Sequence, residues 1–274
     1  MAIYMRWPNG RVKAFTMSYD DGFQQDEALI RLMEQYGIRG TFNLNGGFLH
    51  QEGRCPTEVY KTGGQEIALH GLHHDSMPAM ADANGRYEVL WEREILEEEY
   101  GTVVQGMAYP NGRYSPGTME RLAACGVLYS RTVESTHGFS LVPDTADGWL
   151  RLRTTCHHND PLLPELTERF LSDKPMAEPY LFYLWGHSFE LDRNDGWEKL
   201  RDLFERIGRH ETVWYATNGE IYDYVEAYRR LRYSAACTRA YNPSCITVWV
   251  EKDHVLYAVE PGKMCELKSE VKSQ

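Results

Sequence analysis

The sequence predicts an α/β protein whose parallel strands close into a barrel. Short apolar runs typical of buried strands alternate along the chain with amphipathic segments typical of helices. Such alternation favours parallel strands joined by right-handed crossovers, and the number of units favours a barrel. At 274 residues the chain is long enough to bury a substantial core. We therefore expect a (β/α) barrel over residues 1–232 and a small C-terminal β-hairpin appendage over residues 233–274.

In the first half of the chain, apolar runs bounded by polar residues or glycine predict strands. These expected strands cover residues 12–17, 40–45, 66–69 and 102–109. Helices are expected over residues 26–36, 87–100 and 116–125. Ser115 before Pro116 is typical of a helix start, and Gly37 and Gly126 suit helix ends. The many glutamates of 87–100 are expected to form a solvated face.

The second half continues the alternation and then changes character. Further strands are expected over residues 127–133, 150–155, 180–185 and 212–216. Helices are expected after Asp195, which would act as an N-cap, and from Asn218. Beyond residue 233 the runs 246–250 and 255–259 flank a polar turn typical of a hairpin, and another short run covers 264–267.

Composition and charge exclude several classes of function. The net charge of −11 argues against a general nucleic-acid-binding or anionic-membrane surface. No run approaches the 18 or so apolar residues needed to span a bilayer, and residues 1–8 lack the apolar core of a signal peptide. We therefore expect a cytoplasmic protein. Its six scattered cysteines, with no C-x-x-C pair, are expected to be reduced thiols rather than a zinc site. The sequence does not indicate an oligomeric state.

Ionisable side chains follow several expected strands, where a barrel of this kind collects its functional groups. Asp20 and Asp21 follow the first strand, and adjacent carboxylates repel each other unless a cation or proton intervenes. Taken alone, Asp20-Asp21-Gly22 is more typical of a solvated turn than of a functional site. His70 follows the strand over 66–69, and His187 follows the strand over 180–185. Together these residues predict one functional rim.

The histidines after residue 69 have the spacing of metal ligands. His70 and His74 are four residues apart, which places both on one face of a helical turn. His73 is the competing ligand. With one aspartate, two histidines form a set that zinc, cobalt, nickel, manganese or iron can occupy, and zinc is our first expectation. Of the two aspartates, one would bind the metal and the other would act as a base.

The chain resembles the polysaccharide deacetylase family, which is the NodB-homology domain of carbohydrate esterase family four. Residues 19–22, Tyr-Asp-Asp-Gly, are similar to its first motif, T-F-D-D-G. Residues 64–74 are similar to its second motif, G-H-E-I-x-x-H-[ST]-x-x-H. Residues 108–111 stand where its third motif, R-x-P-[YF], is expected, and 184–187 approximate its final L-x-H. The resemblance spans residues 18–187 and leaves the appendage outside.

The resemblance implies a distorted (β/α) barrel and metal-dependent removal of acetyl groups. It implies that Asp21, His70 and His74 bind the metal. Asp20 would be the general base for the attacking water, and His187 would be the general acid for the leaving group. The backbone N–H of Asn111 would stabilise the oxyanion, and Tyr109 and Trp149 would contact the substrate.

Several positions depart from the family pattern. Ala108 stands where the base-orienting arginine is expected, and Arg113 or Arg153 could substitute for it. Gly71 replaces the Ser or Thr that holds the metal loop. The fourth motif, D-x-x-D-W, is approximated only by residues 144–149, so that Asp147 or Glu190 could orient His187. His157 and His158 could line the pocket or be exposed loop residues.

The expected substrate is an N-acetylated sugar or a related small amide. Aromatic residues near the predicted site could stack on sugar rings or be part of the core; they are Tyr19, Tyr109, Trp149 and Trp185. An O-acetyl esterase would use the same residues. A non-catalytic metal-binding or carbohydrate-binding relative is a third possibility, because the motif-three arginine is missing. Retention of both Asp20 and His187 argues against it.

Overall fold

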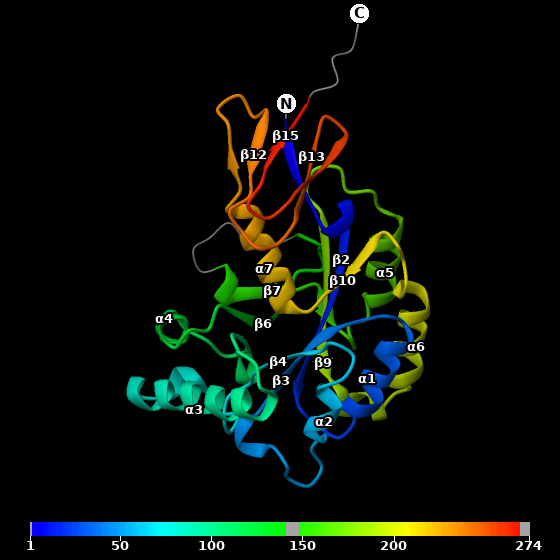
Figure 1. Ribbon diagram of the computed structural model, residues 1–274. Helices are drawn as coiled ribbons and strands as arrows, with labels where there is room; N and C mark the ends of the chain where they lie inside the picture. Colours follow the sequence, from blue (N-terminus) through cyan, green and yellow to red (C-terminus); the bar gives the residue numbers. More distant parts are fainter. Residues whose placement is uncertain (1, 141–147, 269–274) are drawn as a thin grey trace, which may run out of the picture.

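The computed structural model describes residues 2–140 and 148–268, and its centre is a ring of parallel strands (Figure 1). The ring consists of β2 (Lys13–Asp21), β3 (Gly40–Leu44), β4 (Glu66–Leu69), β5 (Gly106–Ala108), β6 (Tyr129–Ser135), β7 (Leu152–Thr154), β8 (Cys156–His157) and β9 (Tyr180–His187). β7 pairs with β6 and β8 pairs with β9, while β9 also pairs with β2. Thr155 between β7 and β8 donates its backbone N–H to the Tyr183 carbonyl at 2.8 Å, which nearly closes the ring. The predicted fold class is confirmed.

β2 is the central strand, because it pairs with three others. β9 runs along nearly its whole length, β10 (Val213–Tyr215) pairs with its first residues and β3 pairs with its last. Successive side chains of a strand point to opposite faces. Accordingly Phe15, Met17 and Tyr19 join the hydrophobic core, whereas Asp20 faces the polar interior of the barrel. The strand therefore delivers a carboxylate to the ring's inner surface.

Seven α-helices accompany the strands in the described ranges. They are α1 (Asp26–Gln35), α2 (Thr57–Tyr60), α3 (Asp82–Tyr100), α4 (Pro116–Ala124), α5 (Leu163–Ser172), α6 (Gly196–Ile207) and α7 (Asn218–Arg229). The predicted N-cap Ser115 is confirmed, since its hydroxyl accepts from the N–H of Thr118. Asp195 stands at the predicted N-cap position of α6, but its side chain makes no capping hydrogen bond and its backbone is left-handed with φ 58°.

The boundaries of some helices and strands differ from those expected, where the hydrophobic pattern of the sequence is weak. α3 begins at Asp82, earlier than expected, and β5 covers three residues of the expected run 102–109. Helix α5 and strand β1 (Ile3–Arg6) were not expected. β1 pairs with residues near position 250, and a partner so distant leaves no local signal.

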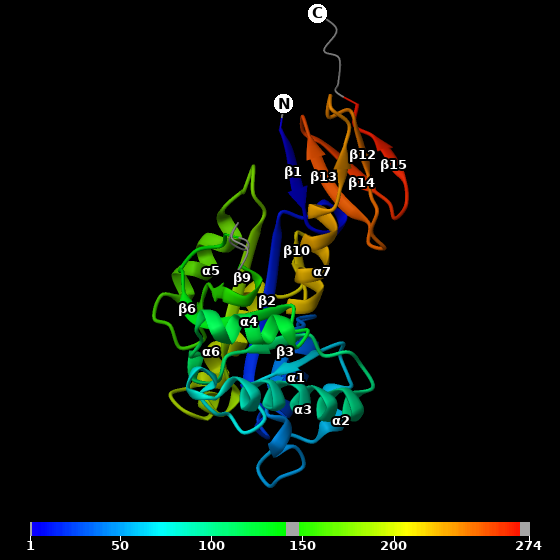
Figure 2. The same cartoon turned by 90° about the vertical axis from the view of Figure 1, so that its left-hand side faces the viewer.

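The C-terminal residues form two three-stranded sheets. β13 (Val248–Lys252) and β14 (Val255–Val259) form the predicted hairpin, and β1 pairs with β13 on its other side. β11 (Arg232–Tyr233), β12 (Arg239–Tyr241) and β15 (Met264–Glu266) form the second sheet. Figures 1 and 2 show these strands with β1 at the end of the molecule opposite α2. The boundary at residue 233 stays a prediction.

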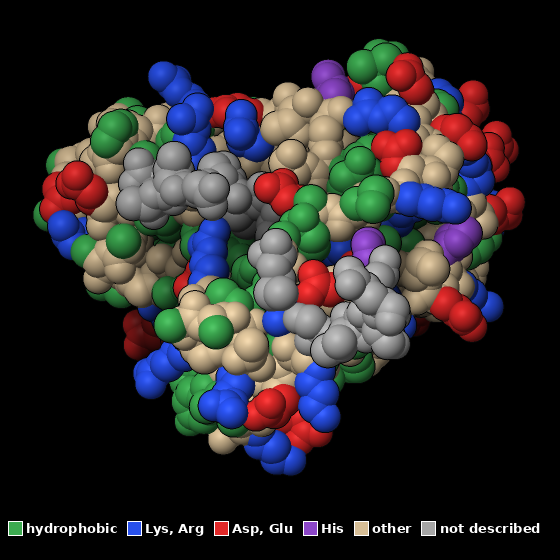
Figure 3. All heavy atoms as spheres, turned by 90° about the horizontal axis from the view of Figure 1, so that it is seen from above, with side chains coloured by type: hydrophobic (Ala, Val, Ile, Leu, Met, Phe, Trp, Pro, Cys, Tyr) green, Lys and Arg blue, Asp and Glu red, His purple; other side chains and the backbone are tan. Residues whose placement is uncertain are grey.

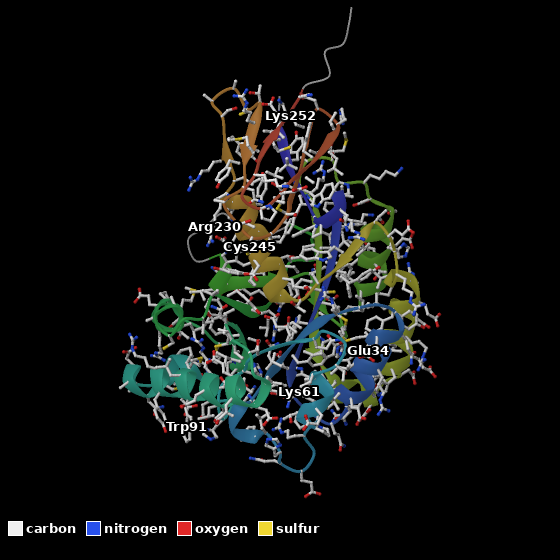
Figure 4. The ribbon with its side chains drawn as sticks, viewed as in Figure 1. Glu34, Lys61, Trp91, Arg230, Cys245 and Lys252 are labelled. Carbon is white, nitrogen blue, oxygen red and sulfur yellow. The ribbon has the colours of Figure 1, made fainter. Side chains whose placement is uncertain are left out.

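The two sheets of the appendage are joined at Lys252, which Figure 4 labels near the top of the molecule. Its side chain is fully buried, and Nζ donates to the carbonyl of Cys237 at 2.9 Å and that of Leu267 at 3.0 Å. A buried ammonium needs such partners, because an unpaired charge is costly in the interior. Lys252 therefore fixes the sheets to each other.

Basic and acidic side chains are interspersed on the appendage end of the molecule (Figure 3). The net charge of −11 is therefore not gathered into one acidic patch on that face. Of the helices in the described ranges, none combines the length and apolar character required to cross a membrane.

Arg6 connects the appendage to the barrel. Its side chain is buried and donates to Glu251 at 2.9 Å and to the Ala177 carbonyl, ahead of β9, at 2.9 Å. Tyr224 of α7 donates to the carbonyl of Arg6 at 2.6 Å and accepts from the N–H of Trp249 at 2.9 Å. The guanidinium thus holds β1, β13 and the barrel wall in one arrangement.

We expect Arg6→Ala to lower the free energy of unfolding by about 2–4 kcal/mol, because it leaves buried acceptors and Glu251 without their donor. Urea denaturation measures the effect. Arg239→Ala is the matched control, because Arg239 pairs with Glu266 on the exposed surface. Equal effects of the two substitutions would contradict the connecting role of Arg6.

Candidate active site

Asp21, His70 and His74 lie together at the C-terminal ends of β2 and β4. Oδ1 of Asp21 is 3.6 Å from Nε2 of His70 and 3.6 Å from Nε2 of His74. Nδ1 of His70 is 2.9 Å from the Ala108 carbonyl, which places the N–H there and turns the Nε2 lone pair toward the group. Two imidazole nitrogens and one carboxylate oxygen at this spacing fit a divalent ion with coordination positions left for water and substrate.

The backbone supports this convergence. The backbones of Asp21 and His74 have φ values of 78° and 61°, in the left-handed region that residues other than glycine seldom adopt. His73 has a different environment: Nδ1 is 3.7 Å from Glu88 and its ring lies edge-on to Phe48. The structure thus brings His74, rather than His73, to Asp21.

Asp20 is buried beside this group and has fixed partners. Oδ1 accepts from Nδ2 of Asn43 at 2.8 Å, and Oδ2 forms an ion pair with Nη2 of Arg131. Oδ2 is also 3.7 Å from Nε2 of His70 and 3.9 Å from Nε2 of His187. Burial by itself raises the pKa of Asp20, but Arg131, His70 and His187 outweigh it and hold the pKa below its usual value. Asp20 is therefore ionised at neutral pH.

The guanidinium that pairs with Asp20 belongs to Arg131, and not to Arg113 or Arg153. Both of those side chains are exposed, and the expectation that one of them would substitute was wrong. Arg131 on β6 pairs with Ala108 on β5 in the register of the two strands. The arginine expected at position 108 is therefore replaced by one on the adjacent strand. The guanidinium of Arg131 also lies over the Trp185 ring at 4.6 Å.

His187 ends β9 and faces two carboxylates. Its Nε2 faces Asp20, and its Nδ1 is 3.4 Å from Oε2 of Glu190 in the turn η6 (Ser188–Asp192). Burial lowers the pKa of His187, but Glu190 and Asp20 outweigh it and raise the pKa above its usual value. Asp147, the other expected partner, lies outside the described residues.

His157 and His158 also approach Glu190, with Nε2 atoms 3.1 Å and 3.2 Å from the same Oε2. His158 is 8% exposed, and its Nδ1 hydrogen-bonds with the Tyr19 hydroxyl at 2.8 Å. Gly186 makes this position possible, since a Cβ there would come within 2.2 Å of the His158 ring. The open choice between pocket residues and exposed loop residues is thus decided for His158, which is buried.

The loop that carries His70 is held by Glu92 rather than by a Ser or Thr at position 71. Gly71 has φ 79°, and a Cβ would approach the ring of Pro110 to 2.8 Å. Glu92 accepts from the N–H groups of Gly46 at 3.3 Å, His70 at 3.2 Å and Gly71 at 3.0 Å. Burial raises the pKa of Glu92 to about 8 despite these donors. The expectation that the glutamates of this helix are all solvated was wrong for Glu92, which is fully buried.

The three expected substrate residues differ in position. Asn111 is exposed in the turn after β5, next to the metal loop, and has φ 55°. Tyr109 is 1% exposed and donates to the Leu150 carbonyl at 2.8 Å. Trp149 packs against α7 and donates to Glu226 at 2.8 Å. The hydrogen bonds of the Tyr109 and Trp149 side chains thus go to Leu150 and Glu226, and not to Asp20 or His187.

Residues 7–130 match the sequence model of a family described as polysaccharide deacetylase. No curated protein matches the chain. A putative polysaccharide deacetylase from Mycobacterium smegmatis shares 19% identity, covers 83% of this chain and 95% of its own, and has a TM-score of 0.59. A probable polysaccharide deacetylase from Pseudomonas aeruginosa shares 17% identity over 82% of this chain and 93% of its own, with a TM-score of 0.59.

A third structure of the same fold is the PuuE allantoinase, which is 17% identical and has a TM-score of 0.57. The match covers 79% of this chain and 91% of the allantoinase chain. At these identities the structures establish a shared fold. Together with the match over residues 7–130 they confirm the resemblance seen in the motifs. Residues 7–130 thus carry the sequence pattern of the polysaccharide deacetylase family, and the chain shares the fold of these structures.

We expect Glu92→Ala to weaken metal binding by about 10–100-fold, because three loop N–H groups lose their acceptor and the loop carrying His70 loosens. Isothermal titration of zinc into chelator-treated protein measures the affinity, and circular dichroism checks folding. Glu94→Ala is the matched control, because Glu94 is exposed on the same helix. Unchanged affinity in folded Glu92→Ala would contradict the anchoring role.

Proposed function

We propose that this protein is a metal-dependent hydrolase that removes acetyl groups from an N-acetylated sugar or a related amide. The observation that carries the proposal is the position of Asp20. Its Oδ2 lies within 4 Å of both the metal-ligand residue His70 and His187, and Arg131 compensates its charge. A base, an acid and a set of metal ligands are the groups that metal-assisted amide hydrolysis requires.

Asp20 would take the proton of the attacking water. A base must be ionised to do so, and the pKa direction of Asp20 fits that state. Asn43 and Arg131 each bind one of its oxygens, which fixes the direction of the remaining lone pairs. Asp21, His70 and His74 would hold the divalent ion, zinc first among the candidates, which when bound supplies Lewis-acid polarisation of the water and the carbonyl.

His187 would protonate the leaving amine through Nε2. The raised pKa of the imidazole favours its protonated form, which a general acid needs before the bond breaks. Glu190 beside Nδ1 supports that form and orients the ring. The backbone N–H of Asn111, an exposed residue in the turn after β5, is our candidate for stabilising the oxyanion.

Two partly exposed aromatic rings favour a saccharide substrate. Trp185 and Phe189 lie 5.8 Å and 5.4 Å from the His187 ring, centroid to centroid. Partly exposed rings beside a catalytic group suit stacking on a sugar. Proteins of one fold can act on different substrates, and one protein of this fold is an allantoinase. The identity of the substrate, both its acyl group and its sugar, therefore requires a direct test.

We expect the metal-reconstituted protein to release acetate from acetylated chito-oligosaccharides, and Asp20→Asn and His187→Ala each to lower kcat by about 10²–10⁴-fold. Metal content should be unchanged in both variants, because neither residue is an assigned ligand. A panel of N-acetylated and O-acetylated sugars identifies the preferred bond. Bound metal without turnover on any of them would contradict the proposal and favour a binding role; turnover on O-acetyl groups alone would favour an esterase.

We expect Arg131→Met to reduce kcat by about 10–100-fold with little change in KM, because the base loses its orienting cation while the substrate contacts stay. Arg153→Met is the control, since Arg153 is exposed on the following strand. Equal activity of folded Arg131→Met and the parent protein would show that Asp20 does not depend on Arg131.

A further inference from the structure

We propose that Tyr19 and His158 form a buried hydrogen-bonded pair that holds Glu190 against Nδ1 of His187. His158 is then a positioning residue of the general acid, because it acts on the His187 ring through Glu190. This inference rests on the proposed function, in which His187 is the acid. The state of the His187 ring can nevertheless be measured without any turnover.

The carboxylate that supports His187 is shared by two further rings. Oε2 of Glu190 lies 3.4 Å from Nδ1 of His187. The same oxygen lies 3.1 Å from Nε2 of His157 and 3.2 Å from Nε2 of His158, within hydrogen-bonding distance. The side chains of Glu190, His157 and His187 are between 21% and 27% exposed. The side chain of His158 is 2% exposed, so it is the one partner of Glu190 that is enclosed by the interior.

His158 is held through both its backbone and its side chain. Its N–H donates to the Trp185 carbonyl of β9 at 2.9 Å, and its Nδ1 lies 2.8 Å from the Tyr19 hydroxyl of β2. β9 ends in His187, and β2 carries Asp20 next to Tyr19. His158 therefore connects the strand of the proposed acid with the strand of the proposed base.

The contact with Tyr19 determines which nitrogen of His158 carries the hydrogen. Burial raises the pKa of Tyr19 well above its usual value, so the hydroxyl keeps its hydrogen and donates to Nδ1. Burial also lowers the pKa of His158, so the ring is neutral and its hydrogen is on Nε2. The other tautomer would turn the Nε2 lone pair toward a carboxylate, which is repulsive. His158 thus offers an N–H to Glu190.

This N–H restricts a carboxylate that could otherwise turn toward water. Burial raises the pKa of Glu190, but hydrogen bonds from the three histidines outweigh it and hold the pKa below its usual value. Glu190 favours the protonated form of His187 only while it stays beside Nδ1. A donor fixed in the interior keeps it there.

Other charged or titratable groups surround the His187–Glu190 pair, and the substitutions of the test leave them in place. They are Asp20 and Asp21 on β2, Arg131 and His70 beside Asp20, Asp26 on α1 beside Ser188, and His157 on β8. Because these groups are common to the parent and the variants, a change in the pKa of His187 reports on Glu190.

We expect His158→Leu to lower kcat of the zinc-loaded protein by about 10–100-fold, because Glu190 loses its fixed donor. The high-pH limb of the kcat profile should move to lower pH, since the acid then loses its proton more readily. NMR titration of the imidazole nitrogens measures the same change without substrate. The His187 signals are assigned from those missing in His187→Ala, and their pKa should fall in His158→Leu.

Two conservative variants separate the hydrogen bonds from packing. His158→Gln keeps an N–H donor near the position of Nε2, and we expect it to retain most of the pKa and of kcat. Tyr19→Phe removes only the hydroxyl, and we expect a smaller fall in both quantities. His50→Leu is the matched control and should change neither, because His50 is exposed beside Glu99. Circular dichroism verifies folding.

An unchanged or higher pKa of His187 in folded His158→Leu overturns the positioning role, whatever the activity is. Equal falls in His158→Leu and His158→Gln also overturn it, because packing rather than the donor would then be responsible. If His158→Leu does not fold, an unchanged pKa in Tyr19→Phe is the overturning result. A lower pKa in His158→Leu, with no acetate released even by the parent, supports the positioning role and contradicts the proposed function.

Discussion

The ion pair between Asp20 and Arg131 is the interaction on which the rest of the site depends. Both side chains are almost fully buried inside the barrel, and neither charge could remain there alone. The pair joins β2 to β6 across the interior. The guanidinium also lies over Trp185 of β9, so three strands are placed relative to one another by one cation. Removing one member of such a pair typically costs about 3–5 kcal/mol, which makes the barrel's geometry and its chemistry inseparable.

Around this pair, the loops are held by backbone hydrogen bonds rather than by apolar packing alone. Glu92 binds three N–H groups of two loops, and Asn45 donates to the carbonyls of His70 and Gly71 at 2.9 Å and 3.0 Å. Metal ligands must be fixed in position before an ion arrives if binding is not to be weakened by ordering them. The helix α3 therefore contributes to the site from outside the barrel, through the buried carboxyl group of Glu92.

Parts of this arrangement could be predicted from the sequence. His70 and His74 share one turn, so their spacing was sufficient, and the apolar run before Asp20 predicted a buried strand. Arg131 could not be predicted, because its partner lies 111 positions away and the contact depends on the β5–β6 register. Glu92 resembles its solvated neighbours in sequence, and only tertiary packing shows that it is buried.

The pairing of β1 with β13 has a consequence for the order of folding. Arg6 and Glu251 are 245 positions apart, so this contact closes nearly the whole chain. During synthesis the strands β2 to β9 can pair on leaving the ribosome, whereas β1 stays an unpaired edge until β13 emerges. Contacts of such large sequence separation are slow to form, and an unpaired edge can associate with other chains meanwhile. The sheet that contains β1 can therefore be completed only after β13 has left the ribosome, and until then β1 has no partner strand.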